Sequence, residues 1–148
     1  MNALVIYESL TGNTKKTAEE ITKELSLLGI NADNNSITNI SMQHLSDADI
    51  VIIGSWTDGI IITGQKPGRA GRLKAMPSLA GKQAIVYCTY AINPGKTLSK
   101  METIVEGLGA EVIGGVAIKR TQIDSGASEL AAKIESMLVN PVVKAKSL

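Results

Sequence analysis

Short apolar runs alternate along this chain with segments in which apolar residues recur every three or four positions. The runs predict strands that are buried on both faces of a sheet, and the recurrence predicts amphipathic helices. The predicted strands span residues 3–7, 30–37, 49–54, 83–89 and 111–118. The predicted helices span residues 13–28, one or two turns within 38–48, 69–76, a segment that buries Leu98, Met101, Val105 and Leu108, and 125–139.

Three local features refine this pattern. The segment 30–37 alternates weakly, so we expect a half-exposed strand near an edge of the sheet. Gly114 and Gly115 predict a bulge inside the last strand. The third strand is expected to end at Gly54, and Asp58-Gly59 predicts a turn, followed by a long irregular loop through Gly68. Strands that alternate with helices predict one α/β domain over residues 1–139, and residues 140–148 are expected to be a C-terminal extension.

A polar turn joins the first predicted strand to the first predicted helix. It contains Ser9, Thr11, Asn13 and Thr14 but no Lys or Arg. Free N–H groups at a helix start favour an anion, so neutral donors of this kind suit a phosphate. Alternatively, these side chains only cap the helix. The residue types by themselves leave both readings open.

The run from Ser9 to Thr14, Ser-Leu-Thr-Gly-Asn-Thr, resembles the phosphate-binding signature of the flavodoxin family, Thr/Ser-x-Thr-Gly-x-Thr. The resemblance implies a doubly wound, five-stranded parallel sheet of order 2-1-3-4-5 with helices on both faces. It also implies non-covalent binding of FMN. The phosphate would lie against Ser9, Leu10, Thr11, Gly12, Asn13 and Thr14. In such sheets ligands bind beyond the carboxyl ends of the strands, here between the first and third.

Two further loops are expected to hold the flavin ring. Trp56 follows the third strand, where an aromatic residue covers the flavin in flavodoxins, and Tyr90 follows the fourth strand. Tyr90 either stacks on the ring or packs beside it, because the second stacking Tyr of the family usually lies further into its loop. The resemblance assigns cofactor-binding roles in these loops to Ser55, Trp56, Thr57, Asp58, Gly59, Thr89, Tyr90 and Ala91.

The chain departs from the family pattern at Thr57. Many flavodoxins have Gly after the loop aromatic, and a peptide flip there favours the neutral semiquinone. A β-branched residue resists a positive φ angle, although Gly59 could accommodate the change instead. We therefore expect less stabilisation of the semiquinone than in an ordinary flavodoxin.

Charge is the second departure. The segment 59–101 has no acid and carries +7, against +1 for the whole chain, so the remainder carries −6. The segment is either a solvated face or a surface for anions: an acidic protein partner, a quinone or the phosphates of NAD(P)H. It lacks interleaved aromatic residues, which disfavours nucleic acid.

Composition bounds the remaining possibilities. The chain has 148 residues, 44% of them hydrophobic, which suits one domain. No signal peptide or membrane-spanning run is expected, and one cysteine, Cys88, fits a reducing cytoplasmic compartment. The only histidine, His44, lies away from the expected site, and no Cys/His cluster has metal-ligand spacing.

Three functions are consistent with these observations. The leading one is an FMN-binding, flavodoxin-like electron carrier with a redox partner protein, for which the charge favours an acidic one. The second is an NAD(P)H-dependent quinone or flavin reductase of the same fold. The third is a flavin-free interaction or regulatory module.

Overall fold

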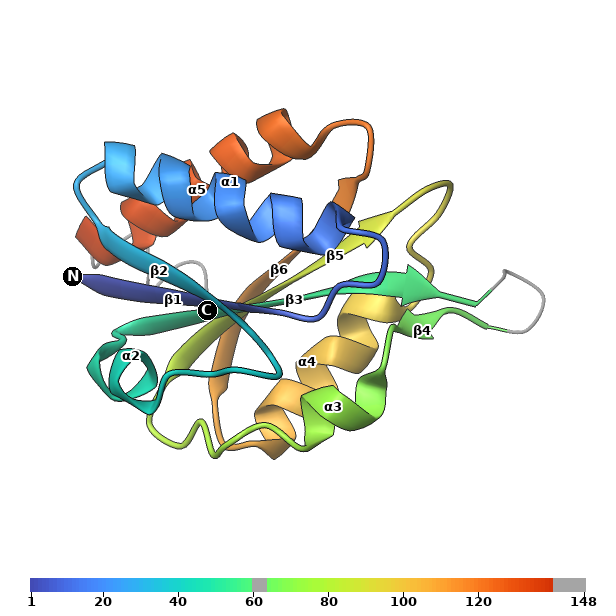
Figure 1. Cartoon of the computed structure of the whole chain (residues 1–148), viewed down its shortest axis with the longest axis horizontal. Coiled ribbons are helices and arrows are strands. Elements are labelled where there is room, and N and C mark those ends of the chain that lie inside the picture. Colours follow the sequence, from blue (N-terminus) through green and yellow to red (C-terminus); the bar gives the residue numbers. More distant parts are fainter. Residues whose placement is uncertain (60–63, 140–148) are drawn as a thin grey trace.

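A computed structural model describes residues 1–59 and 64–139 as a parallel sheet covered on both faces by helices (Figure 1). The strands of the main path follow the order β2-β1-β3-β5-β6. The strands are β1 Asn2–Tyr7, β2 Asn31–Ser36, β3 Ile50–Asp58, β4 Lys66–Pro67, β5 Gln83–Tyr90 and β6 Glu111–Lys119. The helices are α1 Asn13–Leu27, α2 Met42–Asp47, α3 Ala70–Lys74, α4 Thr97–Gly107 and α5 Ile123–Val139.

The predicted parallel sheet is confirmed. Its five main strands pair in the order 2-1-3-4-5 when β4 is left out of the count, and β2 lies at an edge and is mostly half-buried. The bulge predicted in the last strand is also present, because Ala84 pairs with Val112 whereas Ile85 pairs with Gly114. The proposed extension 140–148 lies outside the described residues.

The core consists of two aliphatic layers, one on each face of the sheet. Successive strand side chains point to opposite faces. In β3, Ile50 and Ile52 therefore pack with the apolar residues of α1 and α5, while Val51 and Ile53 pack with those of α2, α3 and α4. Burial on both faces explains why the central strands read as unbroken apolar runs.

The predicted end of the third strand at Gly54 was wrong. β3 continues through Asp58, and its end pairs antiparallel with β4 at Thr57–Pro67 and Asp58–Lys66 (Figure 1). Strand pairing there depends on a partner about ten residues later, which the end of the apolar run at Ile53 does not reveal. The turn begins at Gly59, whose φ is 89°. Residues 60–63 of the predicted loop lie outside the described residues.

Candidate functional site

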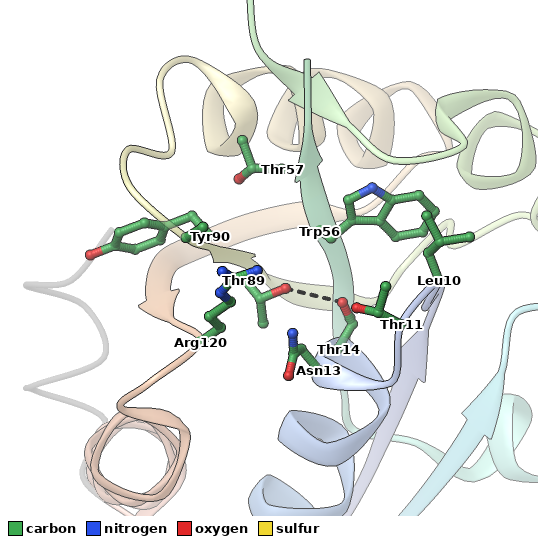
Figure 2. A pocket seen from close by; sticks show the side chains of 10 residues that line it. Leu10, Thr11, Asn13, Thr14, Trp56, Thr57, Thr89, Tyr90 and Arg120 are labelled. Carbon is green, nitrogen blue, oxygen red and sulfur yellow. Dashed lines mark hydrogen bonds between the residues drawn. The ribbon is translucent and has the colours of Figure 1, made fainter. Parts of the chain in front are cut away.

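A pocket of about 190 Å³ opens at the carboxyl ends of the strands (Figure 2). The ends of β3 and β5, the loop after β1 with the start of α1, and the residues that follow β5 and β6 all contribute to it. Its lining residues are Leu10, Thr11, Asn13, Thr14, Trp56, Thr57, Thr89, Tyr90, Ala91 and Arg120. The pocket is at the switch in strand order expected for ligands of doubly wound sheets.

The loop after β1 presents an uncapped helix start to this pocket. Gly12, with φ 100°, is the residue before α1, and no side chain caps the helix there. The hydroxyl of Ser9 instead accepts a hydrogen bond from the N–H of Gly12, at 3.1 Å. The first turn of α1 contains no acid. The alternative that these side chains only cap the helix therefore does not fit, and the N–H groups at the start of α1 favour an anionic ligand.

Two hydroxyls form the buried side of the pocket. Oγ1 of Thr14 lies 3.1 Å from Oγ1 of Thr89, so they share a hydrogen bond (Figure 2). Below them, the buried Tyr87 hydroxyl donates to the Thr14 carbonyl oxygen at 2.9 Å. Burial raises the pKa of Tyr87 well above its usual value, so this side chain stays a neutral donor. The start of α1 is thereby tied to β5 through Tyr87.

Trp56 is supported from outside the pocket. A Cβ added to Gly68 would lie only 2.0 Å from its Cε2 atom, so the indole packs directly on this glycine. The guanidinium carbon of Arg69 lies 5.6 Å from the ring centroid, within cation–π range. Neither residue lines the pocket, so they fix the indole while leaving it part of the pocket wall.

Thr57 carries an unsatisfied polar atom in the pocket wall. Its Oγ1 is buried and has no hydrogen-bond partner among the described residues. Burial raises the pKa of the nearby Cys88 thiol to about 11. The Thr57 hydroxyl offsets a smaller part of that rise in pKa, although the two groups do not form a hydrogen bond of normal geometry. A buried hydroxyl without a partner is costly, and here it lies beside the Cys88 thiol rather than in the open part of the pocket.

Nine of the residues expected at the site line this pocket, namely Leu10, Thr11, Asn13, Thr14, Trp56, Thr57, Thr89, Tyr90 and Ala91. Ser9 and Gly12 belong to the loop after β1 but do not line the pocket. Ser55 is fully buried and donates to the Gly68 carbonyl oxygen at 2.8 Å. Asp58 and Gly59 are exposed farther along the β3–β4 hairpin.

Sequence reasoning missed Arg120 and Glu8. Arg120 follows β6, and its N–H donates to the Tyr90 carbonyl oxygen at 2.9 Å, which brings it to the pocket. Because ligands of such sheets bind beyond the carboxyl ends of the strands, its position directly after the last strand could have indicated it. Glu8 is buried and accepts from Arg69 at 2.7 Å and Arg72 at 3.2 Å. No local sequence signal pairs residues more than sixty positions apart.

The fold and the pocket define a doubly wound α/β protein with a pocket beyond the carboxyl ends of its strands. A protein-family model, that of the flavodoxin domain, matches residues 4–139. The chain therefore belongs to the flavodoxin family, whose members are FMN-binding electron carriers, and the predicted resemblance to that family is confirmed.

Individual relatives agree with this assignment. The flavodoxin of Clostridium beijerinckii is 24% identical over 120 residues, which cover 81% of this chain and 87% of that protein. The fold is also similar to the two-electron reduced flavodoxin of Megasphaera elsdenii, with a TM-score of 0.70, 21% identity, and coverage of 87% and 95%. Oxidised flavodoxin 1 of Bacillus cereus gives a TM-score of 0.66 at 17% identity, with coverage of 89% and 95%.

The described residues contain no group of three or more His, Cys, Asp or Glu side chains arranged to hold a metal ion. In the same part of the chain, no helix is long and apolar enough to cross a bilayer.

Proposed function

We propose that this chain binds FMN non-covalently in the pocket between the phosphate loop, Trp56 and Tyr90, and carries electrons between partner proteins. The single observation that supports this most is the uncapped start of α1 facing the same pocket as Trp56. The first feature suits a phosphate and the second suits a flat aromatic ring. Their shared pocket suits one ligand that has both groups.

Each part of the pocket has a distinct role in this proposal. Thr11, Asn13 and Thr14, with the N–H groups at the start of α1, hold the phosphate. Trp56 and Tyr90 are placed to contact the ring. FMN, when bound, supplies one- and two-electron chemistry. The protein supplies orientation and the surrounding charge.

The absorption spectrum of the purified protein tests the proposal directly. A yellow protein with bound FMN, or a colourless one that takes up a single equivalent of added FMN, is the expected result. A protein that takes up no FMN would instead favour the flavin-free interaction module. Riboflavin should bind more weakly than FMN, because it lacks the phosphate.

The positive charge of the acid-free segment 59–101 supports a second candidate function, that of an NAD(P)H-dependent reductase. A basic surface attracts the phosphates of NAD(P)H as well as acidic proteins. Anaerobic addition of NADPH to the FMN-loaded protein separates the two functions. A carrier leaves the flavin oxidised over minutes, whereas a reductase bleaches it within the mixing time of a manual assay. We also propose a reducing, cytoplasmic location, which the free and buried Cys88 suits.

A further inference from the structure

The seven positive charges of the segment 59–101 are not equivalent in the structure. Arg69 and Arg72 share the buried carboxylate of Glu8. Lys82 donates to two backbone carbonyl oxygens just before β3, at the opposite end of the sheet from the pocket. Arg69 and Arg72 are therefore ion-paired, and Lys82 lies far from the pocket. Three of the other four, Lys66, Lys74 and Lys100, converge on one surface.

These three lysines line a groove of about 470 Å³ between β4, α3 and α4, here called the lysine groove. All three are exposed, and each comes from a different one of these elements. The lysine groove is also lined by Pro67, Ala70, Ser99, Thr103 and Ile104. No acid is among its eight lining residues. The surface is thus positive along its walls and partly apolar between them.

The fold keeps the lysine groove beside the flavin pocket. Lys66 and Pro67 form β4, which pairs with Asp58 and Thr57 of β3, next to Trp56 (Figure 1). α4 packs against both β4 and α3. Nζ of Lys100 donates to the Gln65 carbonyl oxygen at 2.7 Å, which holds its charge beside the start of β4. Asp58 faces Lys66 across the ladder, but the described residues contain no ion pair between them.

We propose that the lysine groove docks an acidic segment of the electron-transfer partner. This inference rests on the proposed function, since it places the partner at the edge of the flavin pocket. Lysine ammonium groups are compact point charges, and here they are spread over three elements. That distribution matches carboxylates spaced along a polypeptide better than a single phosphate group. Complementary charge also accelerates encounter and fixes the docked orientation.

The test compares two variants of equal charge. Lys74→Gln with Lys100→Gln neutralises two walls of the lysine groove. Lys23→Gln with Lys133→Gln removes the same charge from α1 and α5, on the other face of the sheet, where both lysines are exposed. The probe is a fluorescein-labelled ten-residue peptide that alternates Glu and Leu, measured by anisotropy at low salt with the FMN-loaded protein. A Lys–Leu peptide is the matched probe.

The wild type should bind the acidic peptide, lose it at about 200 mM salt and ignore the basic peptide. The groove variant should bind roughly tenfold more weakly, and the control variant within about twofold of the wild type. Equal losses in both variants, or no binding at low salt, would overturn the proposal. Displacement of the peptide by equimolar NADPH would do so too, since it would indicate a nucleotide site. FMN uptake, read from absorbance in the same samples, tests the proposed function separately.

Discussion

Replacement of Gly68 by Ala would test how Trp56 is held at the pocket. An added Cβ would lie 2.0, 2.2 and 2.3 Å from three ring carbons of Trp56, whereas carbon atoms in contact are about 3.5–4.0 Å apart. Ring and backbone would therefore have to separate by about 1.5 Å. The backbone resists this, because the Gly68 N–H donates to the Trp56 carbonyl oxygen and its own carbonyl oxygen accepts from Ser55, both at 2.8 Å.

Two costs follow from this clash. Overpacking typically costs about 1–3 kcal/mol, and a lost hydrogen bond about 0.5–1.5 kcal/mol. We expect the apoprotein to lose about 1–3 kcal/mol of unfolding free energy in urea. If the indole ring moves instead, FMN affinity should fall about tenfold to a hundredfold, where each factor of ten corresponds to about 1.4 kcal/mol of binding free energy. Quenching of flavin fluorescence measures the affinity, and far-UV circular dichroism in urea measures the stability.

Gly71→Ala is the matched control. A Cβ there meets nothing within 4 Å, and the residue lies inside α3. Alanine favours a helix over glycine by about 0.5–1 kcal/mol, so this variant should be as stable as the wild type or slightly more so and should bind FMN normally. A Gly68→Ala protein with wild-type stability and wild-type FMN affinity would refute the proposed support of Trp56.

Four further predictions address the site and its surroundings. Arg120→Gln should lower FMN affinity about tenfold but riboflavin affinity much less, because a guanidinium bonds phosphate strongly; equal losses in fluorescence titrations would contradict a phosphate contact, and Lys119→Gln is the control. Folding raises the pKa of Cys88 from 9.0 to about 11, so the neutral thiol's contribution to the free energy of unfolding is fully present below pH 9 and is lost, by about 2–3 kcal/mol, towards pH 11. Urea titrations of Cys88→Ala should show a shallower fall in stability over this pH range, and an equally steep fall would refute this origin. Dithionite titration should give little blue semiquinone in the wild type and more in Thr57→Gly; a large wild-type yield would contradict the expectation. Glu8→Gln should cost about 1–2 kcal/mol, less than a fully buried pair, because the Arg69 and Arg72 side chains are 39% and 48% exposed; unchanged urea stability would disprove that cost.

Much of the site could be predicted because its signals are local. The apolar run up to Tyr7, the polar turn and the helical spacing after Asn13 are adjacent in sequence, so strand, loop and helix are readable together. The alternation of strands and helices then brings Trp56 and Tyr90 to the same edge of the sheet, because parallel strands end on the same side.

The interior of the site required long-range information. The hydrogen bond from Tyr87 to the Thr14 carbonyl oxygen joins residues 73 positions apart. Gly54 makes room for that ring, since a Cβ there would lie 1.9 Å from it. In the sequence, both residues read only as ordinary members of apolar strands.

The sequence by itself determined the order of elements, the phosphate loop and the family, because local periodicity and residue spacing carry that information. Only the tertiary structure decided that β3 extends to meet β4, that Glu8 pairs with both Arg69 and Arg72, and that three lysines share one groove. Those outcomes depend on which distant side chains burial brings together. A count of charges along the chain cannot separate cations that stabilise the fold from cations that remain available to a partner.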